Sequence, residues 1–289
     1  MRASTRLRQR LRQPGILVAP GAHDALTARI VERVGFEAVY FTGAGFSYTH
    51  LGAPDLGLVS LSETVWRAAA VVEATGLPVI ADADTGYGNA LNVTRAVREF
   101  ERAGVAAIQL EDQVSPKRCG HLSGKAVIET DEMIGKIRAA ADTRQDADLV
   151  IIARTDARAV LGLEQAIERV QRYREAGADL LFVEAPTSKE ELAAIARRLP
   201  PPIMANMVEG GSTPLCAAAE LDAMGYRLVI FPGAAVRMAA AAITKLMAAL
   251  KQDGTTAGLL DQMLSFRELN DLLGLETYRQ IEERFLPAP

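Results

Sequence analysis

A short pattern that recurs along the chain constrains its fold more than any other feature. A helix-like segment ends in glycine, two or three residues follow, and a short apolar run begins, as at Gly35 before residues 38–41. Glycine readily takes the left-handed conformation that ends a helix, so each repeat predicts a helix followed by a strand. The same arrangement recurs at Gly76, Gly104, Gly177 and Gly225.

Eight apolar runs have the length and composition of buried strands. They are residues 16–19, 38–41, 78–80, 107–110, 149–153, 180–183, 202–205 and 228–231. Amphipathic segments lie between them, with the clearest helical spacing at residues 92–102 and 163–175. Strands that alternate with helices form parallel sheets, and eight such units predict an α/β fold closed into a (β/α)8 TIM barrel. An open doubly wound sheet is the alternative that this pattern allows.

The composition predicts one domain over residues 1–289. Hydrophobic residues make up 49% of the chain but aromatic residues only 5%, so aliphatic side chains must fill the core. Such a core suits parallel strands that are covered by helices. After Gly254 the strand pattern stops. This predicts a C-terminal helical extension, about residues 255–289, that packs on the barrel or on a neighbouring subunit.

Charge, hydropathy and cysteine content exclude several classes of protein. The net charge of −4 is spread along the chain and gives no basic face for nucleic acid, and no apolar run is long enough to span a membrane. Cys119 and Cys216 lie in unlike surroundings, which favours free thiols and a cytoplasmic location. Residues 2–12 hold five arginines and no acid, which leaves a transit peptide open. Leu7 and Leu11 lie four apart and favour a short surface helix.

Polar and ionisable side chains follow the predicted strands. The active site of an α/β barrel forms at the carboxyl ends of its strands, so these side chains converge on one rim. They are Thr42, Gly43 and Ala44, then Asp82 and Asp84, Glu111 and Asp112, Arg154 and Asp156, Glu184, and Asn206. Helix caps account for some of them. Capping does not account for carboxylates at five strand ends with an arginine among them, so we predict a functional cluster here.

Carboxylates at this rim predict a site for a hard divalent cation. Asp82 and Asp84 lie two apart on a strand and can point the same way, with Glu111 nearby. Oxygen ligands without a His/Cys cluster favour Mg²⁺, or Mn²⁺, over zinc. Such sites keep several waters, so some carboxylates would bind only through water. The alternative is that Asp82 or Asp84 merely caps the next helix.

Two features predict binding of a small carboxylate. The guanidinium of Arg154 can bind a carboxylate with two parallel hydrogen bonds. The alternative for Arg154 is an ion pair with Glu184 or Asp156. The backbone N–H groups of residues 43–45 are further donors, although this Gly-Ala-Gly run is a weak signal alone.

A polar, basic segment after the fourth predicted strand carries a reactive candidate. Lys117, Arg118 and His121 flank Cys119 and Gly120, and their charge would favour a thiolate. A loop of this composition can close over a site, exclude water and deliver an acid or a nucleophile. The alternative for Cys119 is a packing role, which we favour for Cys216 among its alanines.

Four motifs together resemble one known family. They are residues 52–57 (GAPDLG), 82–88 (DADTGYG), 111–121 (EDQVSPKRCGH) and 153–157 (ARTDA). They resemble the signature segments of the isocitrate lyase/phosphoenolpyruvate mutase superfamily, and the match runs from about residue 10 to the end of the chain. The resemblance implies a TIM barrel whose eighth helix is exchanged with a partner in a homodimer or homotetramer, dependence on Mg²⁺, and pyruvate-like or enolate-like substrates.

The resemblance also implies roles for individual residues. Asp82, Asp84 and Glu111 would form the metal shell, and Thr42, Gly43, Ala44 and Asp55 would surround the pyruvyl unit. Arg154, Glu184 and Asn206 would hold the substrate. Cys119 would be the acid/base, with Gly120 and His121 on the same mobile loop, and Tyr40 is a candidate to take the hydroxyl proton.

The loop of residues 116–121, here called the cysteine loop, is typical of the lyases in this superfamily. We therefore expect cleavage of a 2-hydroxy di- or tricarboxylate to pyruvate and a second carboxylate. Members that hydrolyse oxaloacetate, or that form a C–P bond as carboxyphosphonoenolpyruvate mutases do, keep a similar loop, so these reactions and decarboxylation stay open. Residues 206–214 are closer to the dimethylmalate-cleaving type than to the 2-methylisocitrate-cleaving type. Beside the lyase and these other reactions, a third hypothesis is a barrel that binds a ligand without catalysis.

Overall fold

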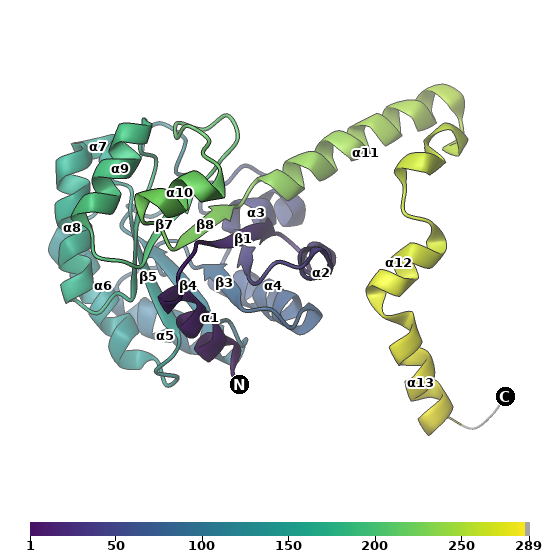
Figure 1. The fold of residues 1–289 in the computed structure, drawn as a ribbon, viewed down its shortest axis with the longest axis horizontal. Coiled ribbons are helices and arrows are strands. Elements are labelled where there is room, and N and C mark those ends of the chain that lie inside the picture. Colours follow the sequence, from purple (N-terminus) through teal and green to yellow (C-terminus); the bar gives the residue numbers. More distant parts are fainter. Residues whose placement is uncertain (287–289) are drawn as a thin grey trace.

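The computed structural model describes residues 1–286, which form a closed barrel of parallel strands with helices around it (Figure 1). Each strand pairs with the next in chain order, and β8 pairs with β1. The strands are β1 (Leu17–Ala22), β2 (Val39–Phe41), β3 (Val79–Asp82), β4 (Ala107–Glu111), β5 (Val150–Thr155), β6 (Leu180–Val183), β7 (Ile203–Asn206) and β8 (Leu228–Phe231). The predicted TIM barrel is confirmed, and an open sheet is excluded.

All eight predicted strands are present, and several extend further toward their carboxyl ends than predicted. Asp82, Glu111 and Asn206 are the last residues of their strands, and Arg154 pairs with Glu111 in the β4–β5 register. These polar residues continue the backbone ladder that the apolar runs begin. The ladder therefore fixes the backbone of the candidate site.

Helices cover the outside of the barrel. They are α2 (Ala25–Val34), α4 (Leu61–Ala74), α5 (Ala90–Arg102), α6 (Thr130–Thr143), α8 (Leu163–Glu175), α9 (Lys189–Arg198) and α10 (Ala218–Met224), with the shorter α3 (Gly43–Leu51) and α7 (Ala157–Leu161) at the rim. Gly35 and Gly225 end their helices at φ of 98° and 111°, as predicted. Gly76 does not end its helix in this way. Instead α4 ends at an extended Thr75, whose hydroxyl accepts a hydrogen bond from the Leu77 N–H.

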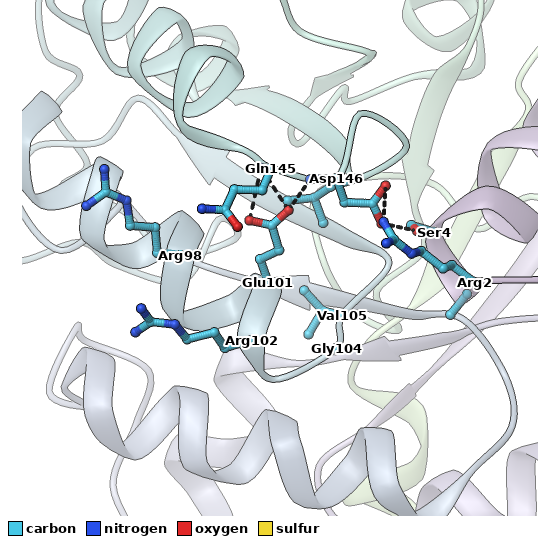
Figure 2. Close-up of a pocket in the computed structure, with 11 residues that line it drawn as sticks. Arg2, Ser4, Arg98, Glu101, Arg102, Gly104, Val105, Gln145 and Asp146 are labelled. Atoms are coloured by element: carbon cyan, nitrogen blue, oxygen red, sulfur yellow. Dashed lines mark hydrogen bonds and ion pairs between the residues drawn. The ribbon is translucent and has the colours of Figure 1, made fainter.

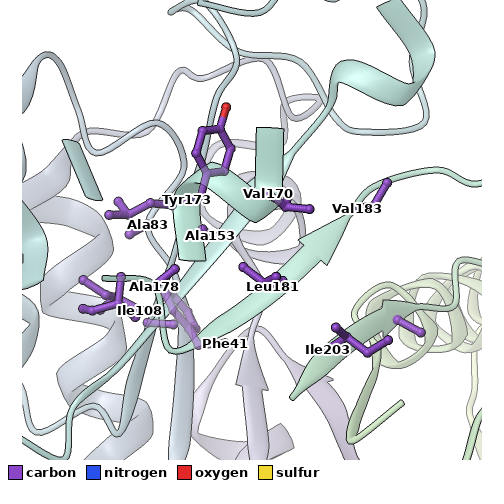
Figure 3. Packing of buried hydrophobic residues seen from close by; sticks show 14 of the residues in the cluster. Phe41, Ala83, Ile108, Ala153, Val170, Tyr173, Ala178, Leu181, Val183 and Ile203 are labelled. Atoms are coloured by element: carbon purple, nitrogen blue, oxygen red, sulfur yellow. The ribbon is translucent and has the colours of Figure 1, made fainter. Parts of the chain in front are cut away.

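Two clusters of buried side chains make the core. One lies between the strands and the helices and includes Phe41, Ile108, Tyr173 and Leu181 (Figure 3). The other fills the barrel interior and takes in Leu7 and Leu11 of α1 (Ala3–Arg12). The predicted surface helix is therefore corrected, because α1 inserts its apolar face into the amino-terminal end of the barrel.

The helices after β8 leave the barrel. The first, α11 (Ala234–Asp253), contacts β1 and then extends outward with only Val236 buried (Figure 1). It is followed by η1 (Ala257–Gln262), α12 (Phe266–Leu273) and α13 (Leu275–Phe285). Residues 287–289, the end of the predicted extension, lie outside the described residues. The segment from α11 to residue 286, here called the C-terminal arm, is therefore mostly not packed against the rest of the described residues.

Both cysteines are free thiols, and Cys216 packs in the core, as predicted. Within residues 1–286, no helix has the length and apolar character needed to cross a membrane. The cytoplasmic location stays a prediction.

Candidate active site

The structure gathers the predicted side chains at the carboxyl rim of the barrel. Asp82, Glu111, Arg154 and Asn206 stand on β3, β4, β5 and β7, and Glu184 directly follows β6. All five side chains are buried. This convergence of charge in a buried site requires pairing, and the pairs determine what the site can do.

Arg154 is held by two carboxylates. Its Nε and Nη2 donate to Asp156 Oδ2 and Oδ1 at 2.8 and 3.1 Å, and its Nη1 lies 3.2 Å from Glu111 Oε2. The guanidinium also lies over the ring of Phe182, 5.4 Å from its centroid. The predicted ion pair with Asp156 is therefore present. It orients Arg154 without excluding a substrate carboxylate, since a guanidinium has five N–H donors.

Glu184 connects Arg154, the predicted clamp for a substrate carboxylate, to the cysteine loop. Its two oxygens accept from Asn206 Nδ2 at 3.2 Å each, and His121 Nε2 lies 3.0 Å from Oε1. Burial alone would raise the pKa of Glu184, but Arg154 and His121 lower it to about 2. His121 Nδ1 accepts from the Ser212 N–H at 3.1 Å, which places the imidazole proton on Nε2, facing Glu184.

A buried acid after β4 supports this cluster from behind. Asp112 Oδ1 accepts from the Asp156 N–H at 2.8 Å, and Oδ2 accepts from Thr155 Oγ1 at 2.6 Å and Tyr173 Oη at 2.9 Å. Arg169 Nη1 lies 3.2 Å from Asp112 Oδ2. Asp112 therefore fixes the strand end that carries Asp156, a role its sequence position did not reveal.

The three predicted metal-shell carboxylates lie at the same rim, and two of them already have a cationic partner, Lys117 for Asp84 and Arg154 for Glu111. Asp82 Oδ1 accepts from Gln109 Nε2 at 3.3 Å and from the Asp84 N–H at 3.2 Å. Burial raises the pKa of Asp84 to about 6 even though Lys117 opposes it, and burial raises the pKa of Glu111 well above its ordinary value. A divalent cation would lower both pKa values again.

The donor set fits an oxygen-coordinated cation. Asp82 Oδ2 accepts no hydrogen bond from the described residues, and a Cβ on Gly43 would lie 3.1 Å from it. Glycine at this position thus leaves space beside the carboxylate. Residues 1–286 hold no group of three or more His, Cys, Asp or Glu side chains arranged to chelate a metal directly. Asp82, Asp84 and Glu111 supply only oxygen donors, which are the ligands that Mg²⁺ prefers together with water.

The amino end of α3 offers backbone donors beside these carboxylates. Thr42 caps the helix and accepts from the Gly45 N–H at 3.2 Å. The N–H groups of Gly43 and Ala44 donate to no acceptor in residues 1–286. The first N–H groups of a helix bind anions well. The predicted position for a substrate carboxylate is therefore geometrically available.

Tyr40 lies inside the barrel, with its hydroxyl donating to Gln109 Oε1 at 3.1 Å. Burial raises the pKa of Tyr40 well above its ordinary value, and Asp82 raises it further. A general base would have to be a phenolate, so this environment does not support the predicted proton-accepting role. Tyr40 instead orients Gln109, which donates to Asp82.

The cysteine loop is closed over the rim. Lys117 Nζ lies 2.6 Å from Asp55 Oδ1 and 2.9 Å from Asp84 Oδ1. Gln113, which sequence reasoning did not select, bonds both the N–H and the C=O of Arg118, at 3.0 and 2.8 Å, and donates to Glu111 at 2.9 Å. Its position next to the Glu111-Asp112 pair was the available signal. The loop is thus tied to the carboxylate cluster by charge and by an amide.

Cys119 is a thiol in this environment, which corrects the expected thiolate. The basic side chains that adjoin it in the sequence face elsewhere, Lys117 to two aspartates and His121 to Glu184. Burial raises the pKa of Cys119 above its ordinary value, and a hydrogen bond from the His121 N–H offsets only part of this. A protonated thiol at neutral pH is suited to donate a proton.

Gly120 must be a glycine for the loop to close. A Cβ at this position would lie 2.5 Å from both Arg154 Nη2 and Glu184 Oε1. The loop backbone therefore rests directly on the clamp, and closure covers the site with Cys119, Gly120 and His121.

A cavity of about 700 Å³ lies between α1, α5 and the segments that precede β4 and β5, and Figure 2 shows the residues that line it. Its lining includes Val105 and Leu149, which precede β4 and β5. Asp146 accepts from Ser4 Oγ at 2.6 Å, and Glu101 accepts from the Gln145 and Asp146 N–H groups (Figure 2). These bonds hold α1 and the α6–β5 turn together. None of the rim side chains described above lines this cavity.

Residues 7–251 match the family described as phosphoenolpyruvate phosphomutase, which covers most of the chain and every residue of the rim. The chain belongs to the isocitrate lyase/phosphoenolpyruvate mutase superfamily. It is accordingly an enzyme of that family, in agreement with the four sequence motifs.

Two curated relatives illustrate the similarity. The 2,3-dimethylmalate lyase of Eubacterium barkeri is 53% identical over 285 residues, which cover 99% of each chain. A 2-methylisocitrate lyase of Aeropyrum pernix is 46% identical over 274 residues, which cover 95% of this chain and 88% of the relative. These relatives support lyase chemistry for the chain.

Solved structures share the fold over nearly the whole length. A crystal structure of 2,3-dimethylmalate lyase superposes with a TM-score of 0.93 at 41% identity, over 98% of this chain and 95% of that one. Oxaloacetate acetylhydrolase with the inhibitor 3,3-difluorooxalacetate gives 0.93 at 40%, over 98% and 97%. Phosphonopyruvate hydrolase with oxalate and Mg²⁺ gives 0.89 at 32%, over 99% and 100%. Family members thus bind small carboxylates and Mg²⁺.

Proposed function

We propose that the chain is a Mg²⁺-dependent carbon–carbon lyase. It cleaves a 2-hydroxy di- or tricarboxylate, of the 2,3-dimethylmalate or 2-methylisocitrate type, to pyruvate and a second carboxylate. The observation that carries the proposal is the closed loop, which places Cys119 beside Asp55 and Gly120 against Arg154 and Glu184, where burial raises the pKa of the Cys119 thiol.

The rim residues bind and orient the substrate. The free N–H groups of Gly43 and Ala44 receive its C1 carboxylate, and Arg154 provides charge-assisted donors from the opposite side. Asn206 and Glu184 fix the Arg154 side of the rim, while the closed loop excludes water. Exclusion of water protects the carbanion that C–C cleavage produces from protonation at the wrong moment.

The reaction needs one proton removed and one supplied. Loss of the 2-hydroxyl proton turns C2–O into a ketone as the C2–C3 bond breaks, and the bonding pair stays on C3, delocalised into its carboxylate. Cys119 Sγ–H then protonates C3, which leaves a thiolate. When the loop opens, the thiolate regains a proton from solvent, and this balances the proton that the 2-hydroxyl lost. Its raised pKa keeps the thiol protonated until that step.

Asp82, Asp84 and Glu111 are the residues that would hold Mg²⁺, partly through water. When bound, the ion supplies positive charge that stabilises the oxyanion developing at C2. Lys117 pairs with Asp55 and Asp84 when the loop is closed, so its single positive charge offsets part of the negative charge of these two carboxylates.

An assay for α-keto acid release tests the function. The protein with Mg²⁺ is offered 2,3-dimethylmalate, 2-methylisocitrate, isocitrate, alkylmalates and oxaloacetate in parallel. We expect pyruvate from at least one hydroxy acid, a loss of at least about 100-fold with EDTA, and recovery with excess Mg²⁺. Full turnover in EDTA would contradict the metal dependence.

The alternatives give different products in the same assay. Acetate plus oxalate from oxaloacetate identifies a hydrolase, pyruvate plus CO₂ identifies a decarboxylase, and a C–P bond seen by phosphorus NMR identifies a mutase. The 0.93 TM-score with oxaloacetate acetylhydrolase makes the hydrolase the second candidate. Any of these products, without pyruvate from a hydroxy acid, would refute the lyase.

We propose further that the C-terminal arm packs on another copy of this chain as a dimer or tetramer. Phe266 is 87% exposed, Met238 71% and Phe285 67%. Exposed apolar side chains on this scale mark an interface. Light scattering after size-exclusion chromatography is expected to give the mass of a dimer or tetramer. A monomer at all concentrations would contradict this proposal.

A further inference from the structure

Lys125 is a buried cation that the proposed chemistry does not use. It lies four residues beyond His121, and its side chain is only 2% exposed. Its Nζ lies 2.7 Å from Asp156 Oδ1 and donates to the backbone carbonyl of Gly120. One ammonium therefore joins the cysteine loop to a residue at the end of β5.

Asp156 is also the carboxylate that fixes Arg154. Its Oδ1 accepts from Arg154 Nη2 at 3.1 Å as well as from Lys125, and its Oδ2 accepts from Arg154 Nε at 2.8 Å. Asp156 is fully buried, and Asp112 holds its backbone. The position of Asp156 is thus rigid, and Lys125 and Arg154 are oriented by the same group.

The other end of the link is the part of the loop that covers the clamp. Gly120 lies so close to Arg154 and Glu184 that a Cβ would be 2.5 Å from each. Its carbonyl faces Lys125, and its chain neighbours are Cys119 and His121. Opening of the loop would remove this carbonyl from Lys125 and leave a buried ammonium with one acceptor fewer, which is unfavourable.

We propose that Lys125 is a positioning residue that couples closure of the Cys119 loop to the orientation of Arg154. The bond to Gly120 stabilises the closed loop, and the bond to Asp156 ties that closed position to the substrate clamp. Lys125 does not touch the substrate in this role, since protein acceptors engage its Nζ. The expected effect on turnover rests on the proposed lyase function, whereas the expected effect on loop closure rests on the contacts alone.

Alkylation of Cys119 measures closure without an activity assay. A Cys216→Ala background leaves one thiol, and the rate of its reaction with iodoacetamide is followed by peptide mass spectrometry over a range of pH. Rates are compared below about pH 9, where Lys125 keeps its proton. Loss of a positive charge near the thiol would raise its pKa and slow the reaction, so a faster reaction reports access. Gly120→Ala, in which the added Cβ forces the loop off the clamp, is the open reference with Lys125 intact. Lys189→Met, which breaks an exposed ion pair with Glu220, is the control for loss of a lysine charge.

We expect Lys125→Met to raise the alkylation rate about 10-fold, toward the Gly120→Ala rate, and to lower kcat/KM about 10- to 100-fold. Lys125→Arg keeps a cationic donor and should restore slow alkylation, and Lys189→Met should match the parent. An unchanged alkylation rate in a folded Lys125→Met protein overturns the proposal. If Lys125→Met does not fold, Lys125→Gln takes its place; failure of both to fold shows a role in folding and also overturns it.

The two proposals fail in different ways. If the parent protein releases no α-keto acid from any hydroxy acid, the lyase proposal fails while the alkylation rates still decide the role of Lys125. If alkylation is unchanged but Lys125→Met lowers turnover, Lys125 acts on the clamp without controlling the loop, and the coupling is refuted while the lyase stands.

Discussion

Cys119→Ala is expected to lower kcat about 1,000-fold while the site still binds its ligands, because loss of a general acid typically costs 10²- to 10⁴-fold. Cys119→Ser should be nearly as slow. A serine hydroxyl is a far weaker acid than a thiol, although it fills the same space. Steady-state pyruvate release measures the loss, and calorimetric titration with oxalate in the presence of Mg²⁺ measures binding.

The control for this experiment is Cys216→Ala. Cys216 packs in the core and is not one of the rim residues. Its substitution should therefore change stability slightly and leave kcat within about 2-fold. Normal turnover in Cys119→Ala would refute the proton-donor role. Loss of oxalate binding together with turnover would instead indicate that the thiol shapes the site.

Arg154→Met is expected to lower both activity and stability. Asp156, Glu111 and Glu184 all lie near the guanidinium in a buried site. Removal of one partner from a buried ion pair costs about 3–5 kcal/mol because the remaining charges are left without compensation. Urea unfolding measures this loss. kcat/KM should fall at least about 100-fold, because a two-bond contact with the substrate carboxylate is lost.

Two variants separate the charge of Arg154 from its shape. Arg154→Lys keeps the charge but cannot reproduce the planar set of donors, so stability should recover more than kcat/KM does. Arg158→Met removes a partly exposed pair with Glu191, at 2.7 Å, and should cost no more than about 1 kcal/mol. Equal losses of stability in Arg154→Met and Arg158→Met would contradict a buried, charge-balanced clamp.

Much of the fold and part of the site could be predicted from the sequence because both depend on local patterns. Apolar runs identified all eight strands, and a glycine preceded five of them, since strand burial and helix ends are set by neighbouring residues. The barrel then brings the strand ends together, so Asp82, Glu111, Arg154 and Asn206 could be assigned to one rim.

Other features depend on which distant groups pair, and only the tertiary structure decided them. Arginines and two leucines four residues apart at the start of the chain resembled a surface helix, yet α1 fills the end of the barrel. Tyr40 follows the pattern of a strand residue near the rim, but its environment keeps the phenol protonated. Lys125 carried no signal in the sequence, because its acceptors are a backbone carbonyl and an acid 31 residues away.

The cysteine loop shows both sides of this division. The sequence by itself determined that a thiol, a glycine and three basic side chains follow the fourth strand, and hence that a reactive loop lies at the rim. Only the tertiary structure decided the protonation state of Cys119, because Asp55 and Asp84 engage Lys117 and Glu184 engages His121. The physical reason is that a buried charge pairs with the nearest opposite charge in space, and that partner is set by the fold rather than by the chain order.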